Sequence, residues 1–262
     1  MNIVKIKEEL LNYLKRNFNM EDPNILRKYE HTQWVATYCY DIAKELNLNE
    51  EQKNLAYVLG LFHDYGRFTQ WVRYGTYNDK LSYPHAELGV ELLFGNNEIE
   101  NFSVPKKYYN LLKIVILQHS KLEINKSITN NEQLLFCKII RDADKVNLYE
   151  LNIDGTLPTF TNLDGVTKEV LQSVEGCKCV NNIFVKTKLD RALLSLASTY
   201  DLNFAFSYKK LEDMQYFEKM ATRFEKILNK EDNVILLKAI DVIKTNLQKI
   251  KQKNKTIKQN KW

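Results

Sequence analysis

The chain has 262 residues, of which 44% are hydrophobic and 27% are charged. This is enough apolar material for a sizeable core, and it excludes a mostly disordered chain. Only 8 Gly and 4 Pro are present, which argues against an all-β fold with many tight turns.

The net charge of +5 is unevenly distributed. Residues 244–262 contain seven Lys and no Asp or Glu, so the rest of the chain has a net charge of −2. A Lys-rich tail could touch nucleic acid or an anionic membrane, but a solvated helix end is the favoured interpretation. The sequence shows no signal-peptide core and no apolar run of about 18 residues, which indicates a cytoplasmic protein without a membrane segment.

Helical signals dominate the chain in order. An amphipathic helix is predicted first, and Asp22-Pro23 and Asn49 mark the starts of the next two. A Gly- and Tyr-rich loop over 73–79 separates these from later helices that follow Pro84 and Pro105. The predicted helices span residues 2–18, 22–46, 49–63, 85–95, 106–119, 132–149, 188–200, 208–228 and 231–252.

Two segments differ from this helical pattern. Residues 150–165 are predicted to form an irregular excursion, and residues 174–187 contain two short β-prone runs around Asn181-Asn182. The second segment predicts a small β-hairpin. No linker-like stretch divides the chain, so we expect a single domain over residues 1–262 that is all-α apart from the hairpin.

All histidines of the chain lie on apolar helical stripes. Each has apolar residues three, four, seven or eight positions away, which places its imidazole on the core-facing side of a helix. Two aspartates share this placement, one directly after a histidine and one on a stripe of its own. These six residues are His31, His63, Asp64, His85, His119 and Asp144.

A single histidine on an apolar face is more often a satisfied core residue than a metal ligand. Here every histidine of the chain is so placed, together with two carboxylates that are costly to bury without a partner. A metal ion is a partner that imidazoles and carboxylates can share. The sequence therefore predicts a metal site.

The order His31…His63-Asp64…Asp144 resembles that of the HD-domain metal-dependent phosphohydrolases. The surrounding segments LGLFHDYGRF (59–68) and IIRDADKVN (139–147) strengthen the resemblance, which covers about residues 25–150. It implies an all-α bundle of five or more helices with the site at its centre, followed by a C-terminal helical extension over about 151–252 and the Lys-rich tail at 244–262. It also implies Asp144, rather than Asp142, as the last ligand, because Lys145 follows it.

The additional histidines His85 and His119 resemble those of the dinuclear branch, which includes the HD-GYP-type phosphodiesterases. That analogy implies two divalent ions, with Fe or Mn expected, bridged by Asp64. The first would be held by His31, His63, Asp64 and Asp144, and the second by Asp64, His85 and His119. A mononuclear site stays open. The GYP signature is missing, which argues against cyclic di-GMP as the substrate.

The expected substrate is a nucleotide or another small phosphate ester, hydrolysed by a metal-activated hydroxide. Mononuclear HD nucleotidases often have a catalytic Glu or His three residues after the HD aspartate, and Arg67 stands there instead. Asp64, Arg67 and Lys145 are the candidate catalytic residues, the last two also as ligands of the substrate phosphate. A salt bridge from Arg67 to Asp79 or Glu87 is an equally weighted alternative.

The loop over residues 70–84 is expected at the mouth of the site. Its Arg73 and Tyr77 are candidate substrate-binding residues, although the loop could equally be a lid that packs on itself. Asp142 is expected to support a ligand histidine. The sequence does not specify the oligomeric state.

A different reaction class uses the same ligands. HD-fold diiron oxygenases, similar to the myo-inositol oxygenase and organophosphonate oxygenase groups, hold two irons with four His and two Asp. Metal identity and the surroundings of the ligands decide between the two chemistries. Hydrolysis is favoured because Arg67 and Lys145 suit a phosphate, and a non-catalytic sensor is disfavoured because all six ligands are present.

Overall fold

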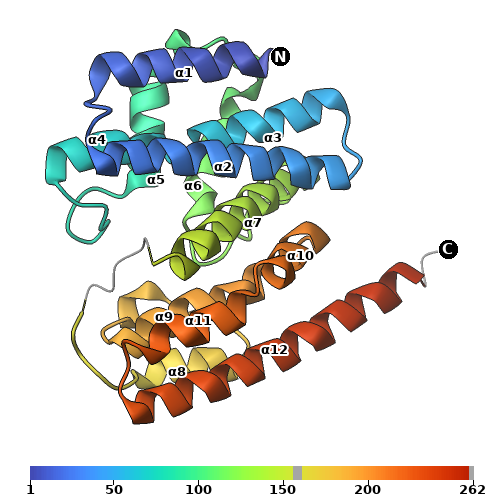
Figure 1. Ribbon diagram of the computed structural model, residues 1–262. Coiled ribbons are helices and arrows are strands. Elements are labelled where there is room, and N and C mark those ends of the chain that lie inside the picture. Colours follow the sequence, from blue (N-terminus) through green and yellow to red (C-terminus); the bar gives the residue numbers. More distant parts are fainter. Residues whose placement is uncertain (156–160, 260–262) are drawn as a thin grey trace. The chain divides into compact units, whose positions relative to one another are not determined.

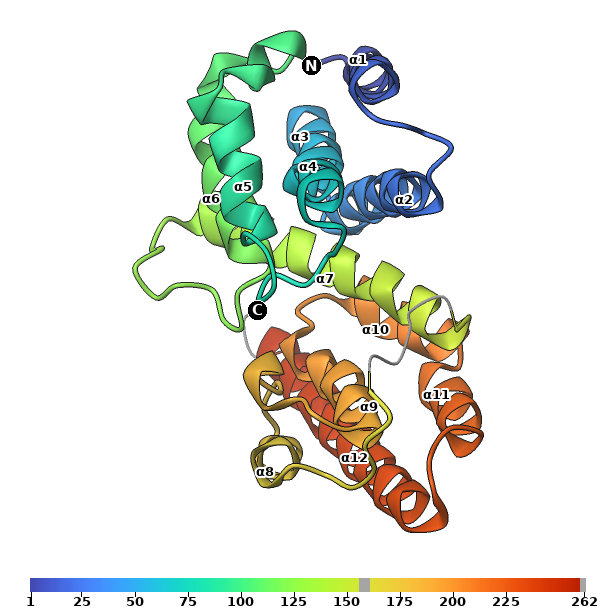
Figure 2. The same cartoon turned by 90° about the vertical axis from the view of Figure 1, so that its left-hand side faces the viewer.

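The computed structural model describes residues 1–155 and 161–259, with side chains described up to residue 249. These residues are helical or irregular and contain no strand, which confirms the all-α prediction. They group into two compact units (Figures 1 and 2). The N-terminal unit comprises Met1–Asn147 and Asn203–Ser207, and the C-terminal unit comprises Leu148–Leu202 and Tyr208–Trp262.

Side-chain caps start the first helices of the N-terminal unit. The side chains of Asn2, Asp22 and Asn49 each accept a hydrogen bond from a backbone N–H of the first turn, and Asn49 forms a capping box with Gln52. The helical elements are α1 (Ile3–Asn17), α2 (Pro23–Glu45), α3 (Glu50–Phe62), α4 (Tyr65–Tyr74), α5 (His85–Val90), the π-helix η1 (Glu91–Gly95), the 3₁₀-helices η2 (Glu98–Asn101) and η3 (Lys106–Tyr108), α6 (Tyr109–His119) and most of α7 (Asn131–Ile153).

Helix α3 lies at the centre of the N-terminal unit, where it packs against α1, α2 and α6. Its contact with α2 is close because residue 60 is glycine. A Cβ atom at Gly60 would lie 2.4 Å from the Cα atom of Ala36, a distance that no side chain tolerates. Figures 1 and 2 show α2 and α3 side by side, and both helices lead into the site described below.

Helices α4 and α5 also meet at a glycine. A Cβ atom at Gly66 would lie 2.1 Å from the carbonyl oxygen of His85 and 2.6 Å from the backbone nitrogen of Gly89. The missing side chain therefore lets the start of α4 touch the start of α5. Because Asp64 precedes α4 and His85 begins α5, this contact brings two of the predicted ligands together.

The C-terminal unit has its own apolar core around α9, which packs against α8, α11 and α12. The buried carboxylate of Asp190 accepts hydrogen bonds from the backbone N–H groups of Thr167, Lys186 and Thr187, which fixes the entry to α9. The elements are α8 (Lys168–Glu175), η4 (Asn182–Phe184), α9 (Lys188–Ala197), η5 (Ser198–Asp201), α10 (Ala205–Asp213, which begins in the N-terminal unit), α11 (Tyr216–Glu225) and α12 (Lys230–Gln259).

The β-hairpin predicted near residues 174–187 is wrong. Helix α8 runs to Glu175, and residues 182–184 form a 3₁₀ turn in which the Asn181 side chain accepts a hydrogen bond from the backbone N–H of Ile183. This local bond holds the segment in a turn, so the β-prone residues around it do not pair. Helices α4 and α8 were not predicted.

Other sequence expectations are not tested by the described residues. The single domain with an HD core and a C-terminal extension stays a prediction. Two compact units are found both in one domain made of two subdomains and in a chain with two separate domains. Part of the predicted excursion over 150–165, namely 156–160, lies outside the described residues. So do the side chains of residues 250–262, which make up most of the Lys-rich tail.

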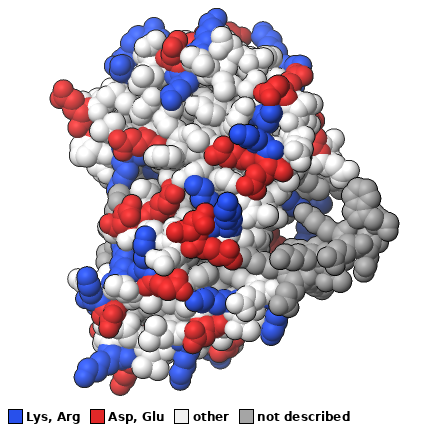
Figure 3. Space-filling view, turned by 45° about the vertical axis from the view of Figure 1, so that its right-hand side comes forward, with Lys and Arg blue, Asp and Glu red and all other residues white. Residues whose placement is uncertain are grey.

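The surface shows no one-sided charge on the face drawn in Figure 3, where basic and acidic side chains alternate. Such mixed charge is typical of an ordinary solvated surface and offers no broad basic face to a nucleic acid. Among the described helices, none is both long enough and apolar enough to cross a membrane.

Replacing Gly66 with alanine should destabilise the N-terminal unit by about 1–3 kcal/mol, because the added methyl group overlaps the backbone of α5. The midpoint of urea unfolding, followed by tryptophan fluorescence, measures the effect. Gly95→Ala is the control, since a Cβ atom there meets only the Glu91 side chain at 3.7 Å. Equal midpoints for the two variants would contradict the close contact of α4 and α5.

Candidate metal centre

Six polar side chains from six places in the N-terminal unit converge on one buried point. His31 lies in α2, His63 directly follows α3, and Asp64 precedes α4. His85 is the first residue of α5, His119 the last of α6, and Asp144 lies within α7. The structure thus brings together all six residues that the sequence predicts as metal ligands. That they bind metal stays a prediction.

Asp64 stands between two pairs of imidazoles. Its Oδ1 atom lies 3.4 Å from Nε2 of His85 and 3.5 Å from Nε2 of His119. Its Oδ2 atom lies 3.6 Å from Nε2 of His31 and 3.8 Å from Nε2 of His63. The Asp64 side chain makes no capping bond to α4, so both oxygens are directed to the imidazoles.

Asp144 faces one of these pairs. Its Oδ1 atom lies 3.1 Å from Nε2 of His31 and 3.8 Å from Nε2 of His63. The pair formed by His31 and His63 therefore has a carboxylate oxygen of Asp64 and one of Asp144 in front of it. This is a set of two nitrogens and two oxygens, which is a usual donor set for a divalent transition metal.

The other pair shows why a cation fits. Nε2 of His85 lies 3.0 Å from Nε2 of His119. The second nitrogen of each ring is already engaged, because Nδ1 of His85 lies 2.7 Å from Oδ2 of Asp79 and Nδ1 of His119 lies 2.6 Å from the carbonyl oxygen of Ile116. Since these oxygens can only accept, each Nδ1 carries the proton and the two facing Nε2 atoms present lone pairs. A cation between them removes this repulsion.

The first pair is oriented in the same way. Nδ1 of His31 lies 2.7 Å from Oδ1 of Asn147, and Nδ1 of His63 lies 2.7 Å from the carbonyl oxygen of Gly60. Nε2 of His63 is buried and has no hydrogen-bond partner, although buried polar atoms are normally paired. All four imidazoles are therefore held by their outer nitrogen, as metal-binding histidines usually are.

Burial keeps two of these imidazoles, those of His63 and His85, neutral. It lowers the pKa of His63 and of His85 to about 4, so at pH 7 both are in the form that binds metal. Burial opposes ionisation of Asp64, but Lys28, the neighbouring imidazoles of His63 and His119, and Arg67 hold its pKa well below the usual range. Two of the imidazole donors, His63 and His85, are thus neutral, and the carboxylate of Asp64 is ionised.

The six residues form one continuous donor cluster. Donor atoms within 4.8 Å of one another occur in His31, His63 and Asp64, and again in Asp64, His85 and His119. The second group contains the residues expected at the second site, and the first contains three of the four expected at the first site, with Asp64 in both groups. The combination His63, His119 and Asp144 satisfies the same distance, so the two groups are adjacent.

Asp79 and Gln70 support the cluster, a role that the sequence analysis did not predict for either residue. Asp79 accepts hydrogen bonds from Nδ1 of His85 and from Gln70, and hydrogen bonds from Gln70 also hold Ser82 and the carbonyl oxygen of Tyr83. Although burial raises the pKa of Asp79, the contacts with His85 and Arg67 hold it below its usual value. Sequence reasoning did not identify Gln70, which lies buried in α4, a helix that was not predicted.

Arg67 forms the salt bridge to Asp79 that the sequence offered as one of its two roles, and its role as a phosphate ligand stays a prediction. Its Nη1 atom donates to Gln70, to the carbonyl oxygen of Tyr77 and to Asp79 at 2.6–3.0 Å, so it closes the loop. Its Nε atom is buried without a hydrogen-bond partner and lies 3.6 Å from Oδ1 of Asp64. One end of the guanidinium is therefore structural, while Nε faces the donor cluster.

Lys28 is a cation at the cluster that sequence reasoning missed. Its Nζ atom lies 3.1 Å from Oδ2 of Asp64, and its side chain is 16% exposed. Lys28 precedes His31 by one turn of α2, so both lie on one helix face. A lysine one turn before a predicted ligand is visible in the sequence, but lysines at such positions are too common to indicate a role.

Tyr77, Arg73 and Lys145 are the remaining predicted substrate residues. Tyr77 is half-buried, its hydroxyl donates to the carbonyl oxygen of Asn24, and its ring lies 5.2 Å from Nζ of Lys28. Arg73 is exposed in the last turn of α4. Lys145 directly follows Asp144, and its Nζ atom donates to the carbonyl oxygen of Arg141 at 3.3 Å. Their roles in substrate binding stay predictions.

Asp142 does not support a ligand histidine, which corrects the expectation from sequence. Its carboxylate accepts hydrogen bonds from the backbone N–H groups of Asn203 and Phe204 and from the Ser207 hydroxyl. Asp142 and Asp144 are two positions apart on α7, so they point in different directions. Asp142 instead anchors the segment 203–207 within the N-terminal unit.

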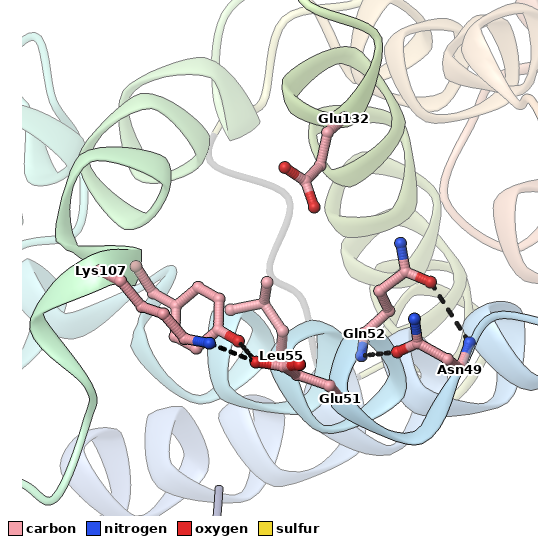
Figure 4. Close-up of a pocket in the computed structure, with 7 residues that line it drawn as sticks. Asn49, Glu51, Gln52, Leu55, Lys107 and Glu132 are labelled. Atoms are coloured by element: carbon pink, nitrogen blue, oxygen red, sulfur yellow. Dashed lines mark hydrogen bonds and ion pairs between the residues drawn. The ribbon is translucent and has the colours of Figure 1, made fainter.

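A surface cavity of about 270 Å³ lies elsewhere in this unit (Figure 4). Most of its polar groups pair with one another, since Glu51 contacts Lys107 and Tyr108 while Asn49 bonds to Gln52. None of the six clustered residues lines it. We therefore assign it no role in the chemistry of the cluster.

Comparison with known proteins agrees with this geometry. Residues 29–148 match the HD domain family. A stretch of 60 residues, 23% of this chain, is 37% identical to the 3'3'-cGAMP-specific phosphodiesterase 1 of Vibrio cholerae, and it spans 14% of that protein's length. No solved structure matches the chain significantly. Residues 29–148 therefore form an HD domain, a domain family whose members are typically metal-dependent phosphohydrolases.

Proposed function

We propose that this chain is a dinuclear metal-dependent phosphodiesterase that acts on a nucleotide or a similar small phosphate ester. The observation that supports this most is the position of Asp64, whose two oxygens face two separate pairs of imidazoles. A carboxylate placed in this way is suited to bridge two ions. The similar stretch in a phosphodiesterase that acts on a cyclic dinucleotide agrees with the proposal.

The residues that would hold the ions follow from the donor pairs. His31, His63, Asp64 and Asp144 suit the first ion, and Asp64, His85 and His119 suit the second. Iron or manganese is proposed for both, because imidazole and carboxylate donors suit these metals. When bound, two such ions lower the pKa of a water molecule and neutralise charge on a phosphoryl group.

The protein's own groups supply orientation and charge. The acceptors of the outer nitrogens of the four histidines fix the rings before any ligand arrives. Nε of Arg67 is buried beside Asp64 without a partner, so it can donate to a phosphoryl oxygen. Lys145, next to Asp144, is proposed to add a second positive charge, and Arg73 and Tyr77 are proposed to contact the rest of the substrate.

Oxygenation is the competing reaction for the same ligand set. The cations Lys28 and Arg67, both beside Asp64, favour an anionic substrate such as a phosphate ester. Uptake of oxygen by the iron-loaded protein without turnover of any phosphate ester would reverse this choice. An oxygen electrode and a phosphodiesterase assay on the same sample distinguish the two reactions.

Replacing Asp64 with alanine should remove both ions and abolish turnover together. We expect metal content to fall from two per chain to below one, and kcat/KM for bis(p-nitrophenyl) phosphate to fall by more than about 10³-fold, the scale of losing a major electrostatic stabiliser. Elemental analysis and initial rates measure the two effects. Glu123→Ala, at an exposed carboxylate, is the control, and turnover that survives in Asp64→Ala places the centre elsewhere.

Replacing His85 with alanine should remove one ion and leave the other. Metal content should fall from two per chain to one, because the donors around His31 and His63 are intact. Asp79→Asn should weaken binding of the same ion by about 10–100-fold, since it alters only the group that holds the His85 ring. Metal titration with a chelator tests both variants. Unchanged stoichiometry in His85→Ala would indicate a mononuclear site.

A further inference from the structure

A cluster of positive charges lies beside the donor cluster, around the ring of Tyr77. Nζ of Lys28 lies 5.2 Å from the ring centroid, and Cζ of Arg27 and Cζ of Arg67 each lie 5.9 Å from it. The ring of Trp71 packs on the same side chain, with the centroids 5.1 Å apart. Three cations therefore surround one neutral ring.

Like charges gathered in this way repel one another unless carboxylates or a bound anion compensate them. Arg67 has a carboxylate partner in Asp79, with Nη1 3.0 Å from Oδ1. The carboxylate paired with Lys28 is Asp64, which the proposed function assigns to both ions. In the described part of the chain, no ion pair joins Arg27 to a carboxylate, and its guanidinium donates to Oδ1 of Asn24.

Asp22, another acid close to Tyr77, is already occupied. Asp22 caps α2 through Oδ1, which accepts from the backbone N–H of Asn24, and its Oδ2 atom accepts from Nε1 of Trp71 at 2.8 Å. When Asp64 is used by metal, Lys28 and Arg27 are thus two adjacent cations without a compensating carboxylate. They lie at consecutive positions of α2, one turn before His31.

We propose that Lys28 and Arg27 form a second anion subsite beside the metal centre, and that the substrate is a compound with two phosphate groups. This inference rests on the proposed function. The first phosphate lies at the metal centre with Nε of Arg67, and the second binds Lys28 and Arg27 over the edge of Tyr77. Tyr77 then acts as a positioning residue, because Trp71 and the cations already cover its ring.

Two linear dinucleotides test the subsite, because they share the same phosphodiester bond and differ only in a terminal phosphate. These are pApA, with a 5′-phosphate, and ApA, without it. The wild-type protein loaded with manganese should prefer pApA in kcat/KM by about tenfold or more, the factor that corresponds to one charge-assisted hydrogen bond. Arg27→Met should reduce this preference to about twofold or less.

Three controls make the result specific. Arg16→Met, at an exposed arginine of α1, should keep the preference for pApA. Arg27→Met should retain two metal ions per chain and should keep its rate with bis(p-nitrophenyl) phosphate, which has a single phosphate. Lys28→Met should lose the preference, and Lys28→Arg should restore most of it.

A wild-type preference near one, or a preference that Arg27→Met leaves unchanged, overturns the subsite. Failure of the proposed function looks different, since none of the three phosphodiesters would then be hydrolysed. In that case the dissociation constants of pApA and ApA, measured by calorimetry, decide the subsite by the same tenfold criterion.

Discussion

Asp64 places a buried carboxylate between two pairs of imidazoles, and burying an ionised carboxylate costs free energy unless positive charge surrounds it. The two oxygens of Asp64 face His85 and His119 on one side and His31 and His63 on the other. Lys28 and Arg67 approach the same two oxygens. The helices around this point are arranged so that all of these groups reach one carboxylate.

The helix contacts show how this delivery is achieved. Asp64 lies at the junction of α3 and α4, where neither helix uses its side chain as a cap. Gly60 lets α3 approach α2, and Gly66 lets α4 touch α5, so His31 and His85 reach the junction from opposite sides. Each imidazole is fixed through its outer nitrogen by an oxygen of Asn147, Gly60, Asp79 or Ile116. Pre-oriented donors of this kind bind metal without first paying for rearrangement.

The sequence predicted the helices and the six converging residues because both leave strong periodic signals. An imidazole with apolar neighbours three, four or seven positions away is predicted to face the core, and His63 and His119 are buried in the structure. The prediction failed where contacts are not periodic. Trp34, the apolar residue three positions after His31, is 54% exposed rather than buried. Asp142 bonds to residues more than 60 positions away. Gln70 and Lys28 gain their roles only from the folded loop and from Asp64, so no local pattern marks them.

The central claim is that two metal ions share Asp64. The most direct test is elemental analysis of the wild-type chain, purified without oxygen or chelators and expressed as metal per chain. The account predicts two transition-metal ions, iron or manganese, in each chain. One ion per chain would contradict the bridging role of Asp64 and leave His85 and His119 with a different role, and a chain without metal would contradict the metal centre itself.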